Sequence, residues 1–73
     1  PKSVTINKIN MREIVEYKLL QQSEAGWNFD SLKNIIYIKI NSSPLKSELE
    51  NSKEITLKKF QKHYKEIQKV VFI

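Results

Sequence analysis

The chain has 73 residues with thirteen Lys+Arg, eight Asp+Glu, one His and no Cys, and its formal net charge is +5. This length predicts a single domain, residues 1–73, and the lack of Cys excludes a disulfide or a zinc site with thiolate ligands. No apolar run approaches the ~20 residues of a membrane-spanning helix and no signal peptide is recognisable, so we expect an intracellular protein, cytoplasmic or nuclear.

The first 25 residues predict a strand and then a helix. Residues 3–9 alternate, with Val4 and Ile6 on one face, which is typical of a strand. Asn10 stands where a helix N-cap would, and apolar residues at helical spacing follow it, which predicts a helix over residues 11–24 that ends before Gly26. A strand with Val15, Tyr17 and Leu19 on one face is the competing interpretation. The helix is favoured.

The middle of the chain predicts a turn and the clearest strand. Residues 26–31 are interpreted as a turn that bears two large aromatics, Trp27 and Phe29. Residues 35–40 form the strand, with Ile36, Ile38 and Ile40 on one side and Ile35, Tyr37 and Lys39 on the other. Apolar residues on both faces indicate a central strand.

The last third predicts two helices and a terminal strand. Ser43 as N-cap and Pro44 at the first helical position predict a short helix that runs to Glu50. Five apolar residues then recur at spacings of three and four and predict a helix over residues 56–69: Leu57, Phe60, Tyr64, Ile67 and Val71. The apolar residues 70–73 are expected to form a strand.

This order of elements predicts a small α+β domain. We expect a short mixed β-sheet with strands near residues 3–9, 35–40 and 70–73, and helices near 11–24 and 56–69 packed on one face. An alternative is a β-grasp domain, because Ile55-Thr56-Leu57-x-x-Phe60, with the helix and apolar strand after it, resembles the strand-helix-strand run of ubiquitin-like domains. That resemblance covers about a quarter of the chain and implies the fold only.

Positive charge is concentrated near the C-terminus. Residues 1–37 hold five bases and four acids, whereas residues 38–73 hold eight lysines and four glutamates. On a helix over 56–69, Lys58, Lys62, Lys65 and Lys69 would form one stripe, with Lys59 and His63 in a flanking row. Lysines placed near phosphates give salt-sensitive, sequence-independent affinity for nucleic acid. The competing interpretation is the solvated face of an amphipathic helix.

Aromatic residues supply a second candidate feature. Tyr37 beside Lys39 on one strand face would suit a platform on which unpaired bases stack next to positive charge. The competing interpretation is that large aromatics fill a small core, and this is favoured for Trp27, Phe29 and Tyr37.

The residues that catalysis needs are sparse. His63 is the sole histidine, Gly26 is the sole glycine, and the acids are scattered, so no catalytic residue, metal ligand or cofactor is predicted. The sequence therefore predicts a non-enzymatic basic module that binds nucleic acid through its C-terminal helix.

Two alternatives remain. The first is a protein-interaction module (an adaptor, an inhibitor or a self-associating domain) that recruits an acidic protein, or a second copy through an edge strand at residues 70–73. The weaker second alternative is a membrane-surface helix.

Overall fold

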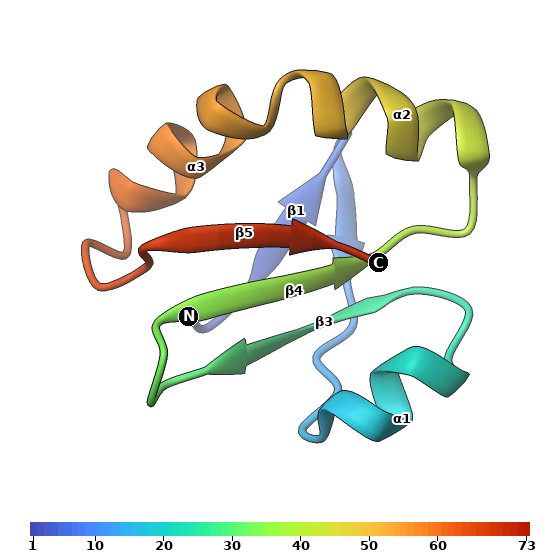
Figure 1. Cartoon of the computed structure of the whole chain (residues 1–73), viewed down its shortest axis with the longest axis horizontal. Coiled ribbons are helices and arrows are strands. Elements are labelled where there is room, and N and C mark those ends of the chain that lie inside the picture. Colours follow the sequence, from blue (N-terminus) through green and yellow to red (C-terminus); the bar gives the residue numbers. More distant parts are fainter.

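The computed structural model describes residues 1–73 and confirms a small α+β domain (Figure 1). In chain order the elements are β1 (Val4–Ile6), β2 (Ile9–Met11), α1 (Tyr17–Gln22), β3 (Gly26–Asp30), β4 (Ile35–Lys39), α2 (Ser43–Asn51), α3 (Lys53–Gln61) and β5 (Lys69–Phe72). The strands form a two-stranded sheet, β1-β2, and a three-stranded sheet in the order β3-β4-β5.

The three-stranded sheet is mixed, as predicted, but β3 stands in it in place of the strand predicted at residues 3–9. β4 is its central strand. β3 pairs with β4 in antiparallel fashion, and β5 pairs with β4 in parallel, with Ile36 opposite both Phe29 and Val70. The predicted strands at 35–40 and 70–73 are therefore confirmed.

The predicted turn over residues 26–31 is wrong, because most of this segment is β3. Trp27 and Phe29 alternate with Asn28 and Asp30, the period of a strand. The turn comes afterwards: the Asp30 carboxylate accepts hydrogen bonds from the backbone N–H groups of Leu32 and Lys33, and Asn34 has a φ of 58°.

The N-terminal region forms a hairpin rather than the strand predicted over residues 3–9. Asn7 and Lys8 have φ values of 55° and 67°. This pair of positive values defines a two-residue turn of type I′, which reverses the chain between β1 and β2. Asparagine tolerates this conformation, so the turn signal is present in the sequence although glycine is missing.

The helix predicted over residues 11–24 is also shorter than expected, because only Tyr17–Gln22 is helical. Met11 belongs to β2, and the next residues lie beside β3. The Trp27 N–H donates to the Arg12 carbonyl at 2.9 Å, and the Ile14 N–H donates to the Trp27 carbonyl at 2.8 Å. Pairing with β3 thus satisfies backbone groups that a helix would have satisfied internally.

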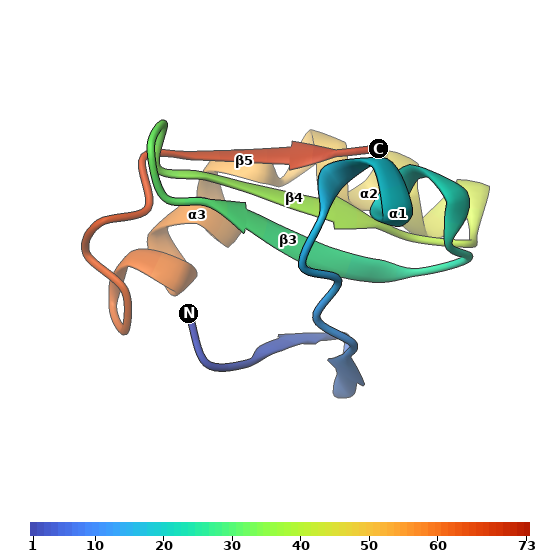
Figure 2. The same ribbon diagram turned by 90° about the horizontal axis from the view of Figure 1, so that it is seen from below.

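One face of the three-stranded sheet carries the core. The buried cluster contains Val4, Ile6, Trp27, Ile36, Ile38, Ile67, Val70 and Phe72, and residues of α2 and α3 pack against it. The β1-β2 hairpin therefore lies on the same side of the sheet as α3 (Figure 2).

Helix α1 packs on the opposite face. The Tyr17 ring lies 4.7 Å from the Tyr37 ring, centroid to centroid, and the Lys39 ammonium donates to the Gln21 carbonyl. Tyr37 and Lys39 alternate with the buried Ile36 and Ile38, so they face away from the core. The prediction that the helices pack on one face of the sheet is therefore correct for α2 and α3 but wrong for α1.

Helices α2 and α3 connect the parallel strands β4 and β5. Helix α2 confirms the predicted short helix, and the side chain of Ser42, one residue before the predicted cap, accepts a hydrogen bond from the Leu45 N–H. Helix α3 ends at Gln61, not at residue 69. The two nine-residue helices extend about 27 Å in total, already longer than the ~17 Å of β4, so the chain must turn back before it can enter β5.

Helix α3 also rules out the β-grasp interpretation. Ile55, Leu57 and Phe60 were expected to form a strand that leads into a helix, but all three lie within α3. The strand-helix-strand run on which the resemblance depended is therefore absent.

Candidate nucleic-acid interface

The predicted stripe of four lysines does not form, because α3 ends too early. Lys58 is exposed on the helix, Lys62 is its C-cap residue, Lys65 lies in a turn and Lys69 is the first residue of β5. The four lysines expected on one helix face therefore lie in a helix, in turns and in a strand.

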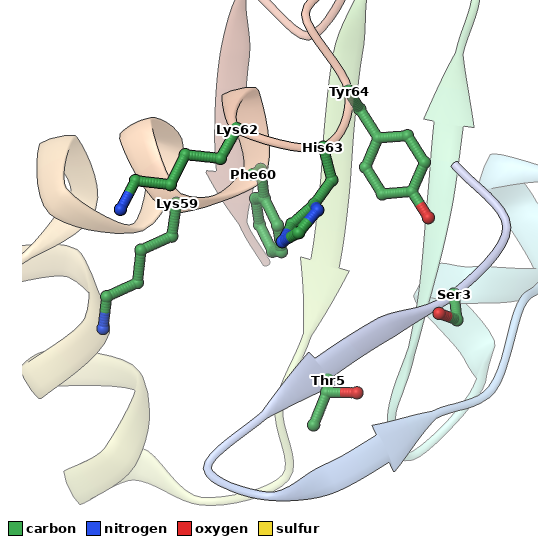
Figure 3. Close-up of a pocket in the computed structure, with 7 residues that line it drawn as sticks. All are labelled: Ser3, Thr5, Lys59, Phe60, Lys62, His63 and Tyr64. Carbon is green, nitrogen blue, oxygen red and sulfur yellow. The ribbon is translucent and has the colours of Figure 1, made fainter.

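Some of the predicted residues instead line an open pocket of about 620 Å³ between α3 and the N-terminal hairpin (Figure 3). We call it the basic pocket; its seven lining residues are Ser3, Thr5, Lys59, Phe60, Lys62, His63 and Tyr64. Lys59, Lys62 and His63 were predicted. No carboxylate is among the lining residues.

Hydrogen bonds after α3 build one wall of the basic pocket. The Phe60 carbonyl accepts from the N–H groups of both His63, at 3.1 Å, and Tyr64, at 2.8 Å. The Gln61 side-chain amide donates to the Ile67 carbonyl at 2.9 Å and ties down the returning chain. These bonds hold Lys62 and His63 at the rim, where both side chains are exposed.

The hairpin supplies the opposite wall. Val4 and Ile6 are buried in the core, so the alternating residues Ser3 and Thr5 are left exposed on β1 and just before it. The backbone N–H of Lys2 donates to the Tyr64 hydroxyl at 3.1 Å. This bond joins the two walls at one end.

The side chains divide the basic pocket into regions (Figure 3). The ammonium groups of Lys59 and Lys62 lie on the α3 side, and their side chains extend away from the rings of Phe60 and His63. The Tyr64 hydroxyl points toward the hairpin. The pocket therefore presents positive charge on one side, hydroxyls on the other and aromatic rings between them.

Tyr37 and Lys39 do not contribute to the basic pocket. They lie on the opposite face of the sheet, where α1 engages both of them. The predicted stacking platform at Tyr37 is therefore largely occupied by Tyr17. Trp27 is 1% exposed and Phe29 packs against the core, which confirms their structural interpretation.

Sequence reasoning missed the hairpin wall. Ser3 and Thr5 are the polar positions of an alternating strand, which identifies them as exposed, but nothing in the sequence pairs β1 with residues near position 60. Phe60 and Tyr64 were assigned to the apolar face of the helix. They do pack against the core, and they line the basic pocket as well.

The terminal strand has less free surface than expected. Val70 and Phe72 are buried in the core, and the Ile73 N–H donates to the Ile38 carbonyl at 2.9 Å. Because β5 is at one end of the order β3-β4-β5, its second backbone edge has no strand partner. An interaction there would use this backbone edge rather than spare apolar side chains.

No three His, Cys, Asp or Glu side chains are grouped as metal ligands, and none of the helices has the length and hydropathy needed to cross a membrane. Comparison of the chain with protein-family models, curated proteins and solved structures gives no match.

Proposed function

We propose that this chain is a non-enzymatic, intracellular binding module that holds nucleic acid by its phosphates at the basic pocket. The observation that carries the proposal is the composition of the lining: Lys59, Lys62 and His63 line the same pocket as three hydroxyl-bearing residues, and no carboxylate competes with an anion. A net charge of +5 favours the approach of a polyanion.

The chemistry predicts affinity with little sequence preference. Lysine ammonium groups act as point charges toward phosphate, while hydroxyl groups add hydrogen bonds to phosphate oxygens. Each neutralised phosphate releases about one counterion, so affinity should fall steeply as salt concentration rises. Arginine, the usual bidentate reader of guanine, does not line the pocket.

A pair of double variants tests the site. Lys59→Glu with Lys62→Glu reverses two charges in the basic pocket, and the control, Lys18→Glu with Lys33→Glu, reverses two charges at exposed lysines outside it. Both variants change the net charge equally. We expect fluorescence anisotropy with labelled DNA and RNA strands to show a loss of affinity of at least about tenfold for the first variant and a much smaller loss for the control.

Circular dichroism should show that both variants stay folded, since all four lysines are exposed. Equal losses in the two variants would mean that binding depends on net charge alone and would overturn the site. An absence of binding by the wild-type chain at low salt would overturn the function.

A second candidate function is self-association through β5. The observation that favours it is the unpaired backbone edge of β5 at the end of the sheet. Pairing of this edge with the same edge of a second copy would extend the sheet across the two chains. Sedimentation over a range of concentrations tests this, because a mass that stays at the 8.7 kDa of one chain would contradict it.

A further inference from the structure

We infer that the basic pocket selects single-stranded over duplex nucleic acid by taking in one unpaired base. This inference rests on the proposed function and adds its substrate class. The base would lie against the rings of Phe60 and His63, and a neighbouring phosphate would lie on Lys59 and Lys62.

The pocket is open and has room for a flat group. Its volume of about 620 Å³ lies within the roughly 300–1,000 Å³ of small-molecule sites. Three aromatic residues, Phe60, His63 and Tyr64, line it, and the centroid of the His63 ring is 6.5 Å from that of Tyr64. Aromatic faces of this kind stack on unpaired bases whatever their sequence.

Positive charge and aromatic rings line the same pocket. Lys59 and Lys62 come from the end of α3, and their ammonium groups lie to the side of the rings (Figure 3). A strand that places a base on the rings would bring its backbone to the ammonium groups. Ser3 and Thr5, on the far wall, present hydroxyls that can bond to base edges or sugars.

The fold is poorly suited to the duplex alternative. In a duplex the faces of the bases are covered by their stacked neighbours, so the rings would find no partner. Helices that read duplexes insert into the major groove. Helix α3 instead packs Leu57 and Phe60 on the core, and its end lines the basic pocket together with the hairpin.

The experiment compares four labelled probes: a twelve-nucleotide oligo-dT, the matching oligo-U, a duplex of twelve base pairs, and a strand of twelve abasic sites with the same phosphates. We expect the wild-type chain to bind oligo-dT or oligo-U about five- to a hundred-fold more tightly than the abasic strand, which is the loss that removal of a stacked base causes. Comparison of oligo-dT with oligo-U shows whether the sugar or the thymine methyl group matters.

Two variants locate the effect. His63→Ala removes an exposed ring, and Phe60→Leu removes a ring while it keeps an apolar side chain against the core. Each should weaken single-strand binding several-fold. Phe60→Leu should leave binding to the abasic strand unchanged, and His63→Ala should weaken binding to the abasic strand much less than binding to oligo-dT or oligo-U. Tyr17→Leu is the matched control, since Tyr17 is an aromatic residue outside the basic pocket, and it should change neither.

The outcomes separate this inference from the proposed function. If the abasic strand or the duplex binds as tightly as oligo-dT and oligo-U, base insertion is wrong although phosphate binding stands. If His63→Ala and Phe60→Leu both leave single-strand affinity intact, the base does not lie on these rings. If none of the four probes binds at low salt, the proposed function itself fails.

Discussion

The hydroxyl of Tyr64 accepts a hydrogen bond from the backbone N–H of Lys2, 62 positions away in the sequence, at 3.1 Å. It is the most distant contact in sequence among the hydrogen bonds that side chains make in this chain. Lys2 precedes β1 and Tyr64 follows α3, so the bond fastens the hairpin wall of the basic pocket to the opposite wall. The N-terminal segment is thereby part of the candidate site.

Tyr64→Phe tests this bond, because it removes the hydroxyl and keeps the ring that packs on the core. The bond is exposed, so we expect a loss of about 0.5 to 1 kcal/mol in the free energy of unfolding, measured by urea denaturation. Tyr17→Phe is the control, since it alters an exposed tyrosine of α1, and it should change stability by less than about 0.5 kcal/mol. Equal stability of Tyr64→Phe and wild type would show that the bond contributes nothing.

Gln61→Ala tests the turn that holds Lys62 and His63 at the rim. The Gln61 amide is partly buried and donates to the Ile67 carbonyl at 2.9 Å, so its removal leaves that carbonyl without a partner and should cost about 1 to 2 kcal/mol. Nucleic-acid affinity should fall as well, because the two rim residues become less ordered. Gln68→Ala, at an exposed glutamine in the same connection, should alter neither quantity. If Gln61→Ala changes neither the free energy of unfolding nor the affinity, this account of the turn is wrong.

Ile67 and Ile55 form a matched pair for testing where the core lies. Ile67 is fully buried, although no helix or strand includes it, whereas Ile55 is 59% exposed on α3. Ile67→Val should cost about 0.5 to 1.5 kcal/mol in urea unfolding, and Ile67→Ala about 2 to 5 kcal/mol. Ile55→Val should stay within about 0.5 kcal/mol. Similar losses for the two valine variants would contradict this assignment of the core.

The burial of Ile67 also shows what hydrophobic spacing can and cannot predict. The spacing of Leu57, Phe60, Tyr64 and Ile67 correctly identified residues that face the core. It did not show that the chain leaves the helix at Gln61 and reaches the same core from a turn. The end of α3 depends on where β4 begins, and this is tertiary information that no local pattern holds.

The N-terminal half shows the same limit. The spacing from Met11 to Leu19 fits a helix, but Arg12 and Ile14 pair with Trp27 through backbone hydrogen bonds that local propensity does not anticipate. For the candidate site, the sequence placed Lys59, Lys62 and His63 near one another because they are neighbours in the chain. It could not place Ser3 and Thr5 opposite them, since that contact spans most of the chain.

Gly26 makes the pairing with residues 12–14 possible, and Gly26→Ala tests it. Gly26 has a φ of 152°, and an added Cβ would lie 2.9 Å from both the Arg12 carbonyl oxygen and the Ile14 Cγ1. Either that backbone segment or β3 must therefore move.

We expect Gly26→Ala to lower the free energy of unfolding by more than about 1 kcal/mol, since alanine is strained at this φ in addition to the close contact. The amides of Ile14 and Trp27, which bond across this contact, should exchange hydrogen faster than in the wild type. Ala25→Gly, at the exposed neighbouring residue, is the control and should leave both amides protected. Unchanged exchange in Gly26→Ala would show that the segment tolerates a side chain and that glycine is not required for β3 to pair with it.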